Sequence, residues 1–216
     1  MHDSQQQRVT TNLGRISGHW IRRGIHLSMP IIPWAYYWHG PTLSELLNTA
    51  VPLAWSLNQW LAAFVILLLA LEALRLHLGW KLPGYRSYEQ KQISAMAWGT
   101  LAIGLTLLLV PDAGYMNAAY GLPLVASLSL ADPLMGELRA RSQLQTRWIT
   151  AIGWATVTAI WLVSTCLLGG SWWLVAILPP ICIWAEQIDL GWMDDNASMI
   201  LAPLIIILLL SPWLTP

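Results

Sequence analysis

The chain has 216 residues and no formal net charge at neutral pH, and it is 56% hydrophobic and only 10% charged. Soluble domains carry about a quarter charged residues, so this composition excludes a water-soluble globule, a nucleic-acid-binding protein and a disordered chain. The mean hydropathy of +0.53 and the 15 tryptophans are typical of a polytopic membrane protein. We expect an all-α fold, with a polar tail over residues 1–21 and one multi-span membrane domain over residues 22–216.

Apolar runs along the sequence predict seven membrane-spanning helices, because a helix needs about 20 apolar residues to cross a bilayer. In chain order these runs are 24–38, 55–74, 93–110, 114–131, 148–168, 172–185 and 197–213. Proline interrupts helical hydrogen bonding. We therefore expect the first span, which carries Pro30 and Pro33, to be kinked or partly re-entrant, and the sixth to break at Pro179 and Pro180.

The basic residues predict how these spans are oriented. All 11 Lys and Arg lie before the first span, between the second and third, or between the fourth and fifth. The alternate loops 39–54, 111–113 and 169–171 hold none. Cytoplasmic loops carry an excess of Lys and Arg, so the pattern predicts an integral, multi-pass membrane protein with a cytoplasmic N-terminus.

A fourth segment on the same predicted face, residues 186–196, is acidic and contains no base. Its carboxylates belong to Glu186, Asp189, Asp194 and Asp195. Basic side chains can hold a polyphosphate, whereas carboxylates can hold Mg²⁺ together with substrate phosphates. The combination at the mouth of an apolar bundle predicts a reaction between a water-soluble nucleotide and a lipid at the cytoplasmic face.

The first candidate motif is Arg22-Arg23-x-x-His26. Residues three and four apart share one face of a helix, so His26 lies next to both arginines at the start of the first span. This arrangement could clamp a phosphate. The alternative is that the arginines only anchor the topology and that His26 is an interfacial residue.

Two further pairs with three-residue spacing flank the second cytoplasmic segment. They are Glu72 with Arg75, at the end of the second span, and Arg86 with Glu89, before the third. An ionisable group within a span usually faces the interior of the bundle, which makes both pairs candidates for a site. The alternative is an interfacial ion pair for the first and a solvated helix start for the second.

Acidic motifs end the fourth span and precede the seventh. Asp132 is followed by Pro133 and Gly136, so it could sit on a bent loop that faces the site. An unpaired anion beside the membrane is costly, which favours a partner for Asp132. Glu186, Asp195 and Asn196 form the second motif, whose clustered carboxylates repel one another unless a cation neutralises them. The alternatives are an interfacial turn and a solvated loop in which Asp195 or Asn196 caps the seventh span.

Together these motifs resemble a known family through their order and their common membrane face. In chain order they are Arg22-Arg23-x-x-His26, Glu72-x-x-Arg75, Arg86-x-x-Glu89, Asp132-Pro133, Glu186 and Asp195-Asn196. The series resembles the polyprenol kinase family, which includes dolichol kinase and phytol kinase and is related to CTP-dependent diacylglycerol kinases and phosphatidate cytidylyltransferases. The resemblance implies a kinase that uses CTP, or another nucleoside triphosphate, and Mg²⁺ to phosphorylate an isoprenoid alcohol in the membrane.

We assign roles on this basis. Catalytic candidates are Asp132, Glu186 and His26; phosphate-binding candidates are Arg22, Arg23, Arg75 and Arg86; metal-binding candidates are Asp132 and Asp195; supporting residues are Glu72, Glu89 and Asn196. Phosphoryl transfer depends mainly on positioning and charge neutralisation, so a sparse site of this kind suffices.

Two alternatives stay open. A cytidylyltransferase would make a CDP-lipid in place of a lipid monophosphate. A diverged, non-catalytic membrane protein is the second, because Ala131 and Met135 stand where the family pattern has glycine and alanine.

Overall fold

The computed structural model describes residues 23–80, 89, 91–110, 116–188 and 190–214. Within these ranges the chain is helical and contains no strand, which confirms the all-α prediction. A short helical stretch over residues 23–28 comes first. It is followed by α3 (Ile31–Ala50), α4 (Leu57–Leu78), α5 (Ala95–Leu109), α6 (Met116–Arg141), α7 (Thr146–Leu168), α8 (Trp172–Gln187), α9 (Asp195–Leu210) and the 3₁₀ turn η2 (Ser211–Trp213).

Local capping explains where several helices begin and end. At the start of α4, the Ser56 side chain accepts from the Gln59 backbone N–H and the Gln59 side chain accepts from that of Ser56, which is a complete capping box. Side chains of Ser94 and Asp194 cap α5 and α9. Helix α4 ends at Gly79, whose φ of 66° is left-handed and suits glycine. These signals fix the boundaries that apolar periodicity alone leaves open.

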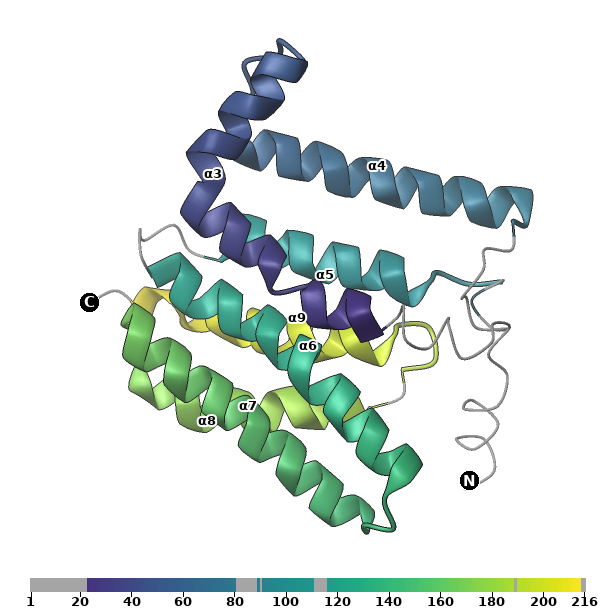
Figure 1. Cartoon of the computed structure of the whole chain (residues 1–216), viewed down its shortest axis with the longest axis vertical. Helices are drawn as coiled ribbons and strands as arrows, with labels where there is room; N and C mark the ends of the chain where they lie inside the picture. Colours follow the sequence, from purple (N-terminus) through teal and green to yellow (C-terminus); the bar gives the residue numbers. More distant parts are fainter. Residues whose placement is uncertain (1–22, 81–88, 90, 111–115, 189, 215–216) are drawn as a thin grey trace.

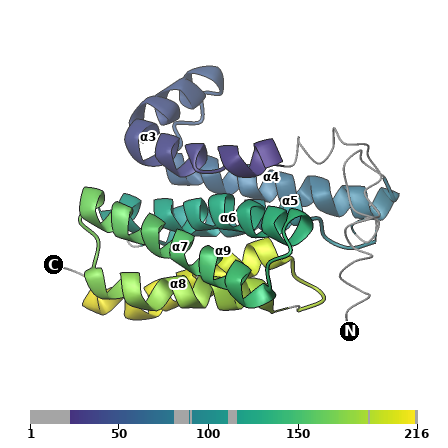
Figure 2. The ribbon, with the colours of Figure 1, turned by 60° about the horizontal axis from the view of Figure 1, so that its bottom comes forward.

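The core lies among the C-terminal five helices. Helix α6 packs most extensively on α7, α8 packs on α7 and α9, and α5 packs on α9. Helix α4 contacts mainly α5 and α3 and lies at the edge of the bundle, as Figures 1 and 2 both show. Along α4 only Val65, Glu72 and Arg75 are buried. The remaining apolar surface of α4 is suited to lipid, since soluble proteins rarely expose a continuous apolar patch of this kind.

Among the residues that the structure describes, four helical segments are long and apolar enough to cross a membrane. They are α4, residues 118–141 of α6, α7, and α9 continued through η2, and the shorter α5 is also apolar. Each exceeds or approaches the length that a bilayer core requires, which supports a membrane protein. The count of seven spans and the cytoplasmic N-terminus stay predictions.

The predicted end of the first span and the predicted break in the sixth were wrong. The first breaks between the 23–28 helix and α3 at Met29 and Pro30, and α3 then continues to Ala50, through most of what was expected to be a loop. The sixth does not break, because α8 runs through Pro179 and Pro180. Proline removes its own N–H donor and its ring crowds the carbonyl four residues earlier, and packing of α8 against α7 and α9 offsets this local cost.

The expected loop at Asp132-Pro133 was also wrong, because α6 continues through both residues to Arg141. Asp132 therefore lies within α6, and its side chain is directed toward the 23–28 helix, where it lies beside His26. The cap of α9 is Asp194, and neither Asp195 nor Asn196 takes that position. Ion pairs with the 23–28 helix and with α8 hold the extended end of α6, and the Asp194 side chain sets the start of α9 by accepting from the Asn196 backbone N–H.

Close packing of α3 on α6 makes Gly121 a sensitive position. A Cβ built there would overlap the Tyr37 hydroxyl and lie 2.8 Å from the ring carbon that bears it. We expect Gly121→Ala to lower the free energy of unfolding by roughly 2 kcal/mol, because a rigid aromatic ring must move. Gly136→Ala on the same helix meets open space and is expected to be neutral or slightly stabilising. Thermal unfolding in detergent measures both, and equal shifts would contradict the packing.

Candidate active site

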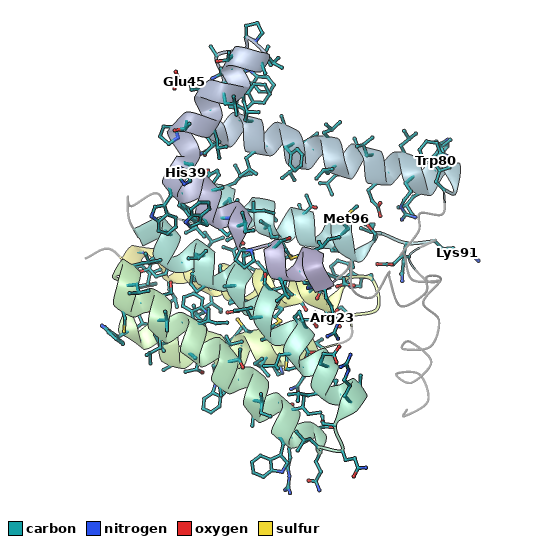
Figure 3. All side chains as sticks on the ribbon, viewed as in Figure 1. Arg23, His39, Glu45, Trp80, Lys91 and Met96 are labelled. Carbon is teal, nitrogen blue, oxygen red and sulfur yellow. The ribbon has the colours of Figure 1, made fainter. Side chains whose placement is uncertain are left out.

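One end of the bundle collects the predicted polar motifs. The end of α4, the start of α5, the ends of α6 and α8 and the start of α9 lie toward the same side of the bundle, on the right in Figure 1, and so does the 23–28 helix. Figure 3 shows Arg23, Trp80, Lys91 and Met96 toward this end and His39 toward the other. We call it the polar end. Some of these motifs, such as those of His26 and Asp195, lie more than a hundred residues apart in the sequence. Only the fold brings them to the same end of the bundle.

Arg23 and Arg141 share the carboxylate of Glu137. Arg23 Nη1 pairs with Glu137 Oε1, and Arg141 Nε lies 2.5 Å from Glu137 Oε2, one helical turn along α6. The Arg141 side chain is 68% exposed, whereas that of Arg23 is mostly buried. The shared carboxylate attaches the 23–28 helix to α6 and leaves Arg141 at the surface of the polar end.

His26 and Asp132, both predicted as site residues, lie together. His26 Nδ1 is 3.6 Å from Asp132 Oδ2, and the His26 residue is only 6% exposed. The pair joins the 23–28 helix to α6 a little deeper in the bundle than the Arg23–Glu137 pair. The separation is longer than a hydrogen bond, so the carboxylate lies beside the Nδ1 edge of the ring at an ion-pair distance. We call these two residues the His–Asp pair.

Arg139 holds Glu186 through two hydrogen bonds. Arg139 Nη1 donates to Glu186 Oε1 at 2.7 Å, and Nη2 donates to Oε2 at 3.1 Å, joining α6 to α8. The Glu186 side chain is 3% exposed and that of Arg139 is 40% exposed. Sequence analysis proposed Glu186 but missed Arg139. The available signal was general: a buried carboxylate needs a counter-charge, but no spacing indicates a partner 47 residues away.

The carboxylates at the start of α9 belong to the same end. The guanidinium of Arg139 is hydrogen-bonded to Glu186, and the negative charges of Asp132 and Asp195 also act on it. Asp194 Oδ1 accepts from the backbone N–H of Asn196 at 3.0 Å, which is its capping bond. Asn196 is buried. That the Asp132 and Asp195 motifs line one common cavity stays a prediction.

Glu72, Arg75 and Glu89 form a different kind of network. Arg75 donates to both carboxylate oxygens of Glu72, at 2.8 and 2.9 Å, and to the carbonyl of Gln92 at 3.0 Å. Glu72 also accepts from the backbone N–H of Ser94 at 2.6 Å, and Glu89 accepts from that of Ala95 at 2.9 Å. Helix starts present unpaired N–H groups. This geometry favours a structural role, in which the network ties the end of α4 to the start of α5.

Arg22, Arg86 and Asp189 lie outside the described residues. Within the part of the chain that the structure describes, no group of three or more His, Cys, Asp or Glu side chains is arranged to hold a metal ion. Mg²⁺ is usually held by one or two carboxylates together with substrate phosphates, so Asp195 is chemically suited to such a cation when a nucleotide supplies the other ligands.

The polar end can therefore combine three elementary functions. The His–Asp pair can accept a proton, arginines at the surface can meet phosphate oxygens, and Asp195 can meet a divalent cation. All three lie where apolar helices end, which is where a lipid headgroup meets water. Comparisons with protein-family models, with curated proteins and with solved structures give no match for this chain.

Proposed function

We propose that this protein is a membrane-embedded kinase that transfers a phosphoryl group from a nucleoside triphosphate, with CTP expected, to a lipid alcohol of the isoprenoid type. The observation that carries the proposal is that two charged pairs, His26 with Asp132 and Arg139 with Glu186, lie at one end of an apolar bundle, where the charges of Asp132 and Asp195 also act on Arg139. The motif order described above adds the nucleotide and the isoprenoid alcohol as expectations.

In the proposed reaction, His26 accepts the proton of the lipid hydroxyl while Asp132 orients the imidazole. The alcohol oxygen bonds to the γ-phosphorus as the bond to the bridging oxygen breaks, and a nucleoside diphosphate leaves. The contacts favour His26 over Glu186 as the base, since both Glu186 oxygens accept hydrogen bonds from Arg139. Glu186 and Arg139 would instead position the ends of α6 and α8.

Charge neutralisation supplies the rest of the mechanism. Arg141, which is well exposed, would contact the nucleotide phosphates, together with Arg23 and the adjacent Arg22. Asp195 would hold Mg²⁺, whose chemistry is to neutralise phosphate charge when it is bound with the nucleotide. Phosphoryl transfer passes through a loose transition state, so positioning and electrostatics account for most of the rate enhancement.

The direct test is an activity assay on the purified full chain in lipid nanodiscs. Radiolabelled CTP, Mg²⁺ and geranylgeraniol or phytol are expected to yield a labelled lipid monophosphate and CDP, and chelation of Mg²⁺ with EDTA should stop the reaction. A CDP-lipid formed from phosphatidate would support the cytidylyltransferase alternative. If no nucleoside triphosphate is consumed and calorimetry detects no Mg²⁺-dependent binding of CTP, the enzymatic proposal fails.

A further inference from the structure

The second half of α3 turns away from the bundle. Figures 1 and 2 both show α3 changing direction partway along its length, so that its second half crosses the direction in which α4 and α5 run. Pro41 lies inside the helix, where it removes a backbone hydrogen bond and bends the axis. A Cβ on the preceding Gly40 would lie 2.8 Å from a methyl carbon of Leu57, so the bend packs against the start of α4. We call residues 41–53 the bent segment.

The bent segment is unsuited to crossing a membrane. Helix α3 has 20 residues, but it is not among the described segments that are long and apolar enough to cross a bilayer. From Pro41 to Ala50 the helix rises by only about 14 Å, which is less than half of a hydrocarbon core of roughly 30 Å. The direction and the length of this segment therefore both differ from those of a span.

The helical part of the bent segment is amphipathic. Four apolar residues recur at the spacing of one helical face: Leu43, Leu46, Leu47 and Ala50. The side chains of Leu46 and Leu47 are exposed, that of Leu46 by 64%. Glu45 lies on the opposite side of the helix, and Figure 3 shows its side chain directed away from the other helices. The segment thus presents leucines on one side and a carboxylate on the other.

Hydrogen bonds fix the orientation of these two faces. Asn48 Nδ2 donates to the carbonyl of Trp55 at 2.9 Å, and the hydroxyl of Ser44 donates to the same carbonyl at 3.1 Å. Asn48 Oδ1 accepts from the Trp55 backbone N–H and from the Trp60 indole, both at 3.0 Å. These bonds tie the bent segment to the start of α4 and satisfy the polar groups between them. The leucine face is left for the surroundings to cover.

We infer that the bent segment lies in the plane of the membrane, on the side opposite the polar end, with Leu46 and Leu47 at the boundary between headgroups and acyl chains and Glu45 in water. In-plane amphipathic helices insert by about 5–10 Å, which is the reach of one layer of leucine side chains. The apolar outer surface of α4 continues this lipid contact, because α3 packs on α4.

The charge of the segment narrows the kind of lipid surface that it fits. Residues 39–56 contain no Lys or Arg, whereas interfacial helices that select anionic lipids carry several. The partner is therefore the headgroup boundary of a neutral phospholipid, bound through apolar contact alone. This inference does not rest on the proposed kinase function.

Spin labels on single cysteines test the inference on the full chain in phosphatidylcholine nanodiscs. Cys166→Ser removes the exposed native cysteine, and the buried Cys182 stays. Leu46→Cys and Leu47→Cys then carry the label on the apolar face, and Glu45→Cys is the matched control on the opposite face. Oxygen partitions into lipid and a nickel chelate stays in water, so the ratio of oxygen to nickel collisions should be several-fold higher at the leucine positions than at Glu45. Adding phosphatidylglycerol should leave these ratios unchanged.

Three results would overturn the inference. Ratios at Leu46 and Leu47 as low as that at Glu45 would place the segment in water. A ratio at Glu45 as high as that of a label on Leu67, an exposed position in the middle of α4, would place the whole segment in the hydrocarbon core. Dipolar broadening between labels on Leu46, with little access for either reagent, would show that a second copy of the chain covers this face. The kinase assay affects none of these measurements, so the inference and the proposed function can fail separately.

Discussion

Asp132→Asn should lower phosphorylation of the lipid alcohol by at least about 100-fold, because asparagine cannot stabilise the imidazolium that His26 forms when it accepts a proton. The prediction follows from the 3.6 Å separation between His26 Nδ1 and Asp132 Oδ2. The side chains have nearly the same shape, so helix content and thermal unfolding should stay close to those of the wild type. Turnover of labelled CTP with geranylgeraniol measures the loss.

Two controls distinguish orientation of His26 from other roles of Asp132. Glu45→Gln replaces an exposed carboxylate on α3, away from the polar end (Figure 3), and should retain full activity. Residues that act as a unit are not additive, so His26→Ala combined with Asp132→Asn should cost no more than His26→Ala alone. An activity loss that high Mg²⁺ concentration reverses would contradict the orienting role and assign Asp132 to the cation.

The second large effect is on the free energy of unfolding. Removing Arg139 should cost more than neutralising its partner Glu186. Arg139→Ala leaves the carboxylate of Glu186, whose side chain is 3% exposed, without its partner. Removing one member of a buried pair typically costs about 3 kcal/mol. Glu186→Gln leaves Arg139, whose side chain is 40% exposed and can turn to water, so the expected cost is about 1 kcal/mol. Thermal unfolding in detergent, with denaturant titration where it is reversible, measures both variants.

A charge reversal and a surface control complete this experiment. The double variant Arg139→Glu with Glu186→Arg should recover part of the stability lost in Arg139→Ala, since the ion pair is re-formed in the opposite sense. Lys91→Ala removes an exposed cation at the polar end and should change the unfolding temperature little. Equal destabilisation by Arg139→Ala and Glu186→Gln would show that burial of Glu186 does not determine the energetics of the pair.

Composition and local pattern were sufficient for the class of this protein. A chain with few charges cannot cover itself with polar surface, and apolar runs of bilayer length have no stable alternative to helices in lipid. The all-α fold follows from this, and so does the expectation that motifs such as His26 and Asp132 face one end of the bundle. Pairs three or four residues apart, such as Glu72 and Arg75, could also be recognised, because helical geometry places them on one face.

Helix boundaries and ion-pair partners were decided by the tertiary structure. The expected loop at Asp132-Pro133 is helical because α6 packs against α7 and the 23–28 helix beyond its apolar run. The pairing of Arg139 with Glu186, across 47 residues, depends on how α6 and α8 pack and has no trace in local spacing. Propensity and hydropathy act over a few residues, whereas the choice of partner for a buried charge depends on which distant helices the packing brings within hydrogen-bonding distance.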